Sequence, residues 1–114
     1  ENTNLNDDVT RIKKNRRSKR KEAFSVASRV ILDNITSSED TIIEVTGHDR
    51  VGLLYDITSA LTSLNLKISS AHVTTFGVEA VDNFYVKDRN NEKLRAPEEI
   101  AKVKKVVLEA VNQT

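Results

Sequence analysis

Two helical segments, each with a single apolar stripe, constrain the fold of this chain most strongly. Apolar side chains recur three or four residues apart in residues 53–64, and the same spacing returns in residues 97–111. A helix with one apolar face must cover another layer, and one face of a four-stranded sheet accommodates two such helices. Strand-like runs with turn signals between them occur at residues 26–34, 41–47, 67–76 and 79–87. The order ββαββα therefore predicts an α+β sandwich of the ferredoxin-like type.

The first strand gives this predicted sandwich an unusual order. Ferredoxin-like chains usually end on a strand, whereas nothing strand-like follows the helix at residues 97–111. The first two strands are joined by a short polar segment, which predicts an antiparallel hairpin. The first strand then fills the edge position that a final strand would normally take, and the crossovers are right-handed. The predicted spatial order of the strands is 26–34, 41–47, 79–87 and 67–76.

Composition limits the kind of protein this is. The 114 residues suffice for one domain and include no cysteine, which excludes disulfides and thiolate zinc sites. No apolar run approaches the roughly 18 residues of a membrane helix, and no signal peptide is evident. We therefore expect a cytoplasmic protein. The chain lacks methionine even at position 1 and opens on a polar run, so we expect it to be a piece of a larger protein.

The positive charge of the chain is concentrated in one segment. Residues 1–22 carry eight basic and four acidic residues, a net +4, while residues 23–114 carry ten and thirteen, a net −3. A nucleic-acid-binding arm would combine such basic residues with aromatic side chains for base stacking, and none are interleaved here. We therefore interpret residues 1–25 as a linker and residues 26–114 as the folded domain, and we do not expect nucleic acid or a membrane as a partner.

The junction between the second strand and the first helix contains an unexpected glycine. In TGHDRVGLL, Asp49 is placed to cap the helix, and Gly52 is predicted in its first turn, where glycine costs roughly 0.5–1 kcal/mol relative to alanine. A helix N-terminus attracts anions, and a missing side chain lets a small ligand approach the backbone. The alternative is that Gly52 relieves crowding between helix and sheet. Local chemistry favours neither explanation over the other.

Isolated polar residues do not suggest catalysis. His48 and His72 do not match zinc-ligand spacing; we expect His48 to be exposed and His72 to be hydrogen-bonded within the sheet. The length of the following turn decides whether His72 lies opposite Asn83 or Phe84. Asp82 lies inside a strand with no second carboxylate evidently beside it, so we expect a satisfied or interfacial aspartate rather than a general acid or base.

Four motifs occur in order along the chain: TIIEVTGHDR, GLLYDIT, SAHVTTFG and AVDNFYV. Together they resemble an ACT domain, a regulatory module that senses small molecules. Over about residues 28–110 the chain resembles, more narrowly, the C-terminal ACT domain of bacterial PII uridylyltransferase/uridylyl-removing enzymes.

This resemblance implies a regulatory role. The intact enzymes attach UMP to the PII protein when glutamine is scarce and remove it when glutamine is plentiful, and their nucleotidyltransferase activity implies Mg²⁺. Catalysis would lie outside this chain, which would have no cofactor of its own and would sense L-glutamine. The partner would be another ACT domain, either a second copy or a tandem one, in side-by-side association.

The resemblance also implies which residues bind the ligand. Asp49 would bind the ligand ammonium, and the backbone N–H groups from Gly52 to Leu54 would bind its carboxylate. The implied loop positions are Asp49, Arg50, Val51, Gly52, Leu53 and Leu54. The implied positions on the opposing copy are Asn65, Lys67, Ile68, Ser69 and Ala71.

Two positions depart from the family pattern. Val51 replaces a proline that would preorganise the loop. Lys67 stands where ACT domains often have asparagine, and lysine has no hydrogen-bond acceptor. Either Asn65 substitutes for that asparagine, Lys67 binds the carboxylate, or this copy binds weakly. A dimerisation module without ligand is thus an alternative function; a nucleic-acid-binding domain and an acylphosphatase-like enzyme are others that the motifs support less.

Overall fold

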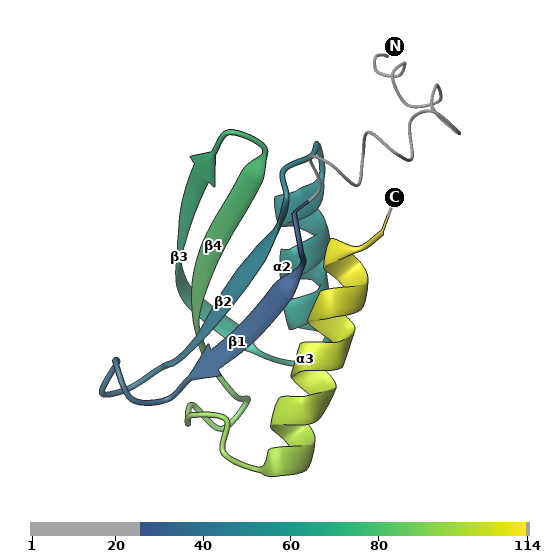
Figure 1. Ribbon diagram of the computed structural model, residues 1–114. Helices are drawn as coiled ribbons and strands as arrows, with labels where there is room; N and C mark the ends of the chain where they lie inside the picture. The colour runs from purple at the N-terminus through teal and green to yellow at the C-terminus, as the bar shows by residue number, and fades with distance from the viewer. Residues whose placement is uncertain (1–25, 114) are drawn as a thin grey trace.

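The computed structural model describes residues 26–113 and shows a four-stranded antiparallel sheet with two helices against one face (Figure 1). The strands are β1 (Arg29–Asp33), β2 (Thr41–His48), β3 (Lys67–Phe76) and β4 (Glu79–Lys87). The helices are α2 (Leu53–Ser63) and α3 (Pro97–Val111). The sheet order is β1-β2-β4-β3, which confirms both the α+β ferredoxin-like fold and the predicted order of the strands. The predicted linker, residues 1–25, lies outside the described residues.

The strand boundaries differ from prediction mainly at β1. This strand spans Arg29–Asp33 rather than residues 26–34. It ends early because the Asp33 carboxylate accepts hydrogen bonds from the backbone N–H groups of Ile35 and Thr36, at 2.8 and 3.2 Å, which turns the chain away from the sheet. β3 and β4 begin and end at the predicted residues, and β2 continues one residue further, to His48.

The core lies between the sheet and the two helices. β4 alternates strictly, so that Ala80, Asp82, Phe84 and Val86 are buried on the face that the helices cover. The predicted helical stripes are confirmed, since their central residues are buried in this layer. The helices contribute Leu53, Ile57, Ala60, Leu61, Val103, Val107 and Val111 to it. Asp82 is therefore the one carboxylate on β4 that shares the phase of the apolar core residues.

Backbone hydrogen bonds end α2 in a Schellman motif. The Leu66 N–H donates to the Leu61 carbonyl at 3.2 Å, and the Asn65 N–H donates to the Thr62 carbonyl at 2.9 Å. Asn65 adopts a left-handed conformation with φ of 64°, which asparagine tolerates better than most residues. Asn65 thus has a structural role independent of any ligand. At α3, Pro97 occupies the first helical turn, as predicted.

β3 forms one edge of the sheet. Among the described residues it pairs only with β4, through a two-residue turn in which Gly77 has φ of +61°. This turn length places His72 opposite Asn83, which decides between the two registers left open by the sequence. The outer edge of this ten-residue strand therefore presents unpaired backbone groups, which are a template for pairing with another chain.

Candidate functional site

The loop between β2 and α2 contains a tight turn. The Leu53 N–H donates to the Arg50 carbonyl at 3.2 Å, and Gly52 has φ of 85° and ψ of −3°. These angles belong to the third position of a type II β-turn, which glycine adopts without strain. Val51 occupies the second position, where proline is favoured, and is fully exposed. The local turn type explains both the glycine here and the family proline.

Gly52 lies before α2, so the prediction that it sits in the first helical turn is wrong. A Cβ atom at this position would meet only the Arg50 guanidinium, at 3.8 Å, which is an ordinary contact. Crowding therefore does not explain Gly52, whereas its left-handed backbone does. The crowded glycine is Gly47, where a Cβ atom would lie 2.6 Å from Cγ1 of Val111 in α3.

Among residues 26–113, no side chain caps the N-terminus of α2. The prediction that Asp49 is the cap is wrong, because the turn places the N-cap position at Gly52 and starts the helix at Leu53. Instead the Asp49 backbone N–H donates to the Val78 carbonyl at 2.8 Å, which ties the loop to the β3–β4 turn. The first N–H groups of a helix lack intrahelical partners and carry the positive end of its dipole. This helix end therefore offers donors to an anionic group.

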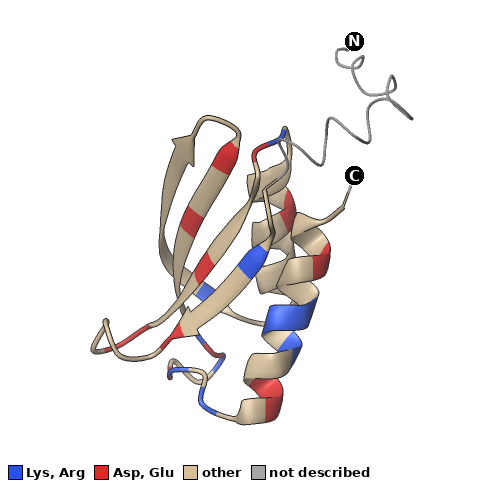
Figure 2. Cartoon of the chain, viewed as in Figure 1, with Lys and Arg blue, Asp and Glu red and all other residues tan. Residues whose placement is uncertain are grey.

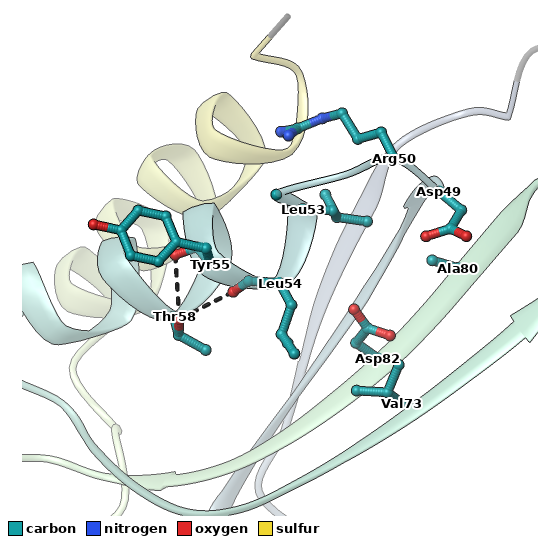
Figure 3. A pocket seen from close by; sticks show the side chains of 10 residues that line it. Asp49, Arg50, Leu53, Leu54, Tyr55, Thr58, Val73, Ala80 and Asp82 are labelled. Carbon is teal, nitrogen blue, oxygen red and sulfur yellow. Dashed lines mark hydrogen bonds between the residues drawn. The ribbon is translucent and has the colours of Figure 1, made fainter. Parts of the chain in front are cut away.

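A pocket of about 510 Å³ opens beside this helix end (Figure 3). Its size lies within the range of small-molecule sites. The loop, α2, β3 and β4 line it, with Asp49, Arg50, Gly52, Leu53, Leu54, Tyr55, Thr58, Val73, Ala80 and Asp82. The structure thus brings together all the predicted loop positions except Val51, whose side chain is solvent-exposed.

The guanidinium of Arg50 is engaged within the chain. It forms an ion pair with Asp56 at 2.9 Å and donates to the Ala110 carbonyl, near the C-terminus of α3, at 3.0 Å. Figure 3 shows this guanidinium turned toward α3 and away from the carboxylates of Asp49 and Asp82. Arg50 therefore anchors the loop to both helices and does not neutralise these two acids.

Within the pocket, the carboxyl group of Asp82 has a pKa that departs clearly from its usual value. It is 2% exposed, and its Oδ1 atom has no hydrogen-bond partner within residues 26–113. Burial raises the pKa of its carboxyl group, and the nearby charge of Asp49 raises this pKa further. A hydrogen bond from the Thr74 backbone N–H partly opposes both effects on the pKa. Sequence reasoning found no second carboxylate beside Asp82, whereas the structure supplies Asp49.

The β3 positions predicted from the family lie apart from this pocket. Lys67 donates from Nζ to Oδ1 of Asn91 at 3.0 Å, and Ser69 donates from Oγ to Oδ1 of Asp40 at 3.2 Å. Ile68 and Ala71 lie on the same half of β3, and Asn65 lines a different pocket, near the C-terminus of α2. Within one chain, the two predicted halves of the site therefore do not meet.

Four residues of the pocket were not assigned to the site from the sequence. They lie on α2, on β3 and on β4 beneath them. They are Tyr55, Thr58, Val73 and Ala80. Asp82 was expected to be a satisfied or interfacial aspartate, and the first of these alternatives is wrong, because its Oδ1 atom has no hydrogen-bond partner within residues 26–113. Its signal was available in the sequence, since a carboxylate occupies a core-facing position between Ala80 and Phe84 in an alternating strand.

Neither histidine belongs to the site. His48 is exposed, as predicted, and His72 is also exposed, with its ring 5.3 Å from that of Tyr85 in an edge-on arrangement. Within residues 26–113, no three histidine, cysteine, aspartate or glutamate side chains gather as a metal site would require. Figure 2 shows acidic positions on the part of β4 near the β3–β4 turn, and of the acidic residues on β4 only Asp82 lines the pocket.

Comparison with known proteins identifies the family. The model of the ACR family N-terminal ACT domain matches residues 36–113. The chain belongs to the ACT domain family. The fold agrees, since a crystal structure of an unknown protein from Galdieria sulphuraria superposes with a TM-score of 0.51 at 18% identity, covering 62% of this chain and 37% of that one.

Curated relatives carry more specific names. This ACT domain is 50% identical over 91 residues to a bifunctional uridylyltransferase/uridylyl-removing enzyme of Gluconobacter oxydans, covering 80% of this chain. Enzymes of the same name from Azospirillum brasilense and Rhodospirillum rubrum are 47% and 43% identical, over 81% and 80% of the chain. The chain spans about 10% of the length of each of these relatives. In the described part of the ACT domain, no helix is long and apolar enough to cross a membrane.

Proposed function

We propose that this ACT domain is a regulatory module that binds L-glutamine within a uridylyltransferase/uridylyl-removing enzyme. The observation that carries the proposal is the pocket in which an uncapped helix N-terminus faces the carboxylates of Asp49 and Asp82. The family match supports the regulatory ACT module, and the names of the curated relatives support the parent enzyme.

The pocket suits an α-amino acid because its two sides have opposite polarity. The N–H groups of Gly52 and Leu54 at the start of α2 would donate to the ligand carboxylate, whereas the Leu53 N–H between them donates to the Arg50 carbonyl. Asp49 would accept a hydrogen bond from the ligand ammonium group. Leu53 and Leu54 supply an apolar wall for the aliphatic part of the side chain.

A second ACT domain would complete the site. The unpaired edge of β3 would pair with the same strand of a second or tandem copy, which extends one sheet into the other. Exposed apolar side chains beside this edge, Leu54, Tyr55 and Val73, would be covered by such pairing. Asn65, Lys67, Ile68, Ser69 and Ala71 of one copy would then face the pocket of the other.

The whole enzyme would use this module as an allosteric device. Glutamine would favour one arrangement of paired ACT domains and thereby favour removal of UMP from PII over its attachment. Such coupling typically amounts to about 1–3 kcal/mol. In this scheme residues 26–114 form the C-terminal ACT domain, residues 1–25 link it to the preceding copy, and Mg²⁺ serves catalytic domains elsewhere.

A pairing module that binds no ligand is the second candidate. Lys67 replaces the usual asparagine and its Nζ is bound to Asn91, so this residue would have to release that bond before it could reach a ligand. Val51 stands at the position where a proline would preorganise the turn. This candidate retains self-association through β3 and loses glutamine binding.

Calorimetric titration of the 114-residue chain with L-glutamine tests the proposal, with L-glutamate and 2-oxoglutarate as control ligands. We expect selective binding of glutamine that Asp49→Asn weakens and that Glu109→Gln, a change at an exposed carboxylate on α3, leaves intact. Absence of binding at millimolar glutamine in a folded, self-associated protein would refute the sensor and favour the pairing module.

A further inference from the structure

Asp82 occupies a position in β4 where a carboxylate is costly. Its cross-strand neighbours are Val45 on one side and Val73 on the other, so it is flanked by apolar side chains on the core face. With 2% of its surface exposed, it has almost no contact with solvent. Burial of an ionised carboxylate without a partner is strongly unfavourable. Its retention here therefore calls for a reason other than packing.

The described residues use only part of the hydrogen-bonding capacity of the Asp82 carboxylate. The Thr74 backbone N–H donates to it, while Oδ1 has no partner among the residues that the structure describes. The nearest cation of the pocket, Arg50, is held by Asp56 and by the Ala110 carbonyl. Asp82 therefore keeps an unused acceptor that faces the pocket it lines.

A second carboxylate, that of Asp49, adds to the uncompensated negative charge of the pocket. Asp49 lines the same pocket and lies close enough to raise the pKa of Asp82 through its charge. Figure 3 shows both carboxylates on the sheet side of the pocket, away from the Arg50 guanidinium. Within residues 26–113, these two acids have no free cation beside them in the pocket, which favours a ligand group that is positively charged and rich in N–H donors. A primary ammonium group has both properties.

We propose that Asp82 and Asp49 together form an ammonium-binding subsite, in which Asp82 selects ligands with a protonated amino group over otherwise identical ligands without one. This inference rests on the proposed amino-acid-binding function and adds to it a specificity-determining residue on β4. The ammonium group supplies the donor that Oδ1 lacks, and the start of α2 receives the carboxylate of the same ligand. Discrimination arises because a ligand without the ammonium leaves the buried carboxylate unpaired.

The competing arrangement has Asp82 protonated and donating a hydrogen bond to a carbonyl or carboxylate oxygen of the ligand. The raised pKa is compatible with either arrangement in the free protein. The two differ in what an asparagine would do, since its amide keeps a donor while losing the negative charge. If ionised Asp82 binds the ammonium group, Asp82→Asn should therefore abolish selectivity for ligands that have this group. If protonated Asp82 donates to a ligand oxygen, Asp82→Asn should preserve binding.

The experiment compares two ligands that differ only in the amino group, L-glutamine and 4-carbamoylbutanoate. Their affinities are measured by calorimetry for the 114-residue wild-type chain, for Asp82→Asn and for Glu44→Gln. Glu44 is the matched control, because it is a carboxylate on the neighbouring strand, opposite Asn83 on the other face of the sheet. We expect Asp82→Asn to weaken glutamine binding at least tenfold and to leave 4-carbamoylbutanoate binding unchanged or stronger. Glu44→Gln should leave both affinities unchanged.

A second measurement needs no variant. Binding of an ammonium group favours the ionised form of Asp82, so glutamine should release protons at mildly acidic pH and bind more weakly as the pH falls. Calorimetry in two buffers of different ionisation enthalpy counts these protons. The other charged or titratable groups lining the pocket are Asp49 and Arg50 from the loop and Tyr55 from α2, while β3 contributes Val73. The same titration of Asp49→Asn should retain proton release from Asp82.

The outcomes separate the two proposals. If the wild-type chain binds no glutamine, the proposed function fails and the subsite fails with it. If it binds glutamine but Asp82→Asn keeps the preference over 4-carbamoylbutanoate, the subsite is refuted and the function stands. Should Asp82→Asn not fold, binding of glutamine by wild type without proton release refutes the subsite in the same way.

Discussion

Replacement of Gly52 by alanine directly tests whether the positive φ at this position accounts for the glycine in the β2–α2 loop. The backbone at this position has φ of 85°, where an L-residue other than glycine costs roughly 1–2 kcal/mol. The nearest atom to an added Cβ is 3.8 Å away, so steric overlap adds nothing. Alanine also restricts the unfolded chain, which offsets roughly 0.4–1 kcal/mol of this cost. We expect Gly52→Ala to lower the free energy of unfolding by about 1 kcal/mol.

The assay is urea denaturation followed by circular dichroism, with thermal unfolding alongside. About 1 kcal/mol corresponds to roughly 4–8 °C in Tm for a domain of this size, and the urea dependence of the unfolding free energy should stay constant. Gly52→Asn should recover part of the loss, because asparagine tolerates the left-handed region. Both variants should fold to the same secondary structure.

Gly77→Ala is the matched control. Gly77 also has a positive φ, of 61°, and no atom of the described residues lies within 4 Å of a Cβ added there, but it lies in the β3–β4 turn outside the pocket lining. The two alanine variants should lose similar stability, and only Gly52→Ala should weaken ligand binding. A loss at Gly52 below about 0.3 kcal/mol, or one several-fold larger than at Gly77, would refute a purely conformational requirement for this glycine.

Three further changes follow from the same structure. Val51→Pro should stabilise the fold by about 0.4–1 kcal/mol in thermal unfolding, because proline fits the second position of a type II turn; destabilisation would contradict that turn type. Gly47→Ala should destabilise by about 1–3 kcal/mol in urea titrations because its Cβ would lie 2.6 Å from Val111, and the double variant with Val111→Ala should show non-additive costs. Because the pKa of Asp82 is raised above 3.8, the native state binds its proton more tightly than the unfolded state, and stability should fall as the pH rises from about 3.8 through the native pKa. Asp82→Asn should remove this decline, so a stability difference from wild type that does not grow between pH 4 and pH 7 would contradict the raised pKa.

Pairing through β3 is the last prediction. The 114-residue chain should self-associate, as measured by analytical ultracentrifugation, because the outer edge of β3 is unpaired within the described residues. Val73→Lys, a change on this strand at a side chain that is 53% exposed, should shift the protein toward monomer without unfolding it. A wild-type chain that stays monomeric at high concentration would contradict pairing through this edge.

The elements of this fold followed from the sequence because their signals are local. Strand-like runs on either side of the Gly77 turn predicted the ends of β3 and β4, and the apolar stripe of α3 behind Pro97 predicted that helix. The start of α2 was missed, because Asp49 is a good cap by residue type and only the turn at Gly52 shows that the helix begins later. The start of β1 was misplaced because its apolar residues extend further than its pairing with β2.

The candidate site was predictable in part for the same reason. The loop positions are contiguous in the sequence, so the resemblance to ACT domains was sufficient to predict them, whereas the short pattern around Gly52 alone was not specific. The chemistry of the site depends on residues far apart in the chain, which no local pattern relates. Asp49 meets Asp82 only because β2 and β4 pair side by side, and Arg50 is withdrawn from both acids only because α3 ends beside the loop and presents the Ala110 carbonyl.

The sequence by itself thus determined the order of the elements and the apolar faces that must be covered, whereas the left-handed backbone of Gly52 came from the structure. The order and the apolar faces depend on residues a few positions apart, whose spacing sets local conformation. The tertiary structure decided where charge is left uncompensated. Whether a carboxylate is paired, buried or exposed depends on which distant groups pack against it, and for Asp82 these are two valines, a backbone N–H and a second carboxylate.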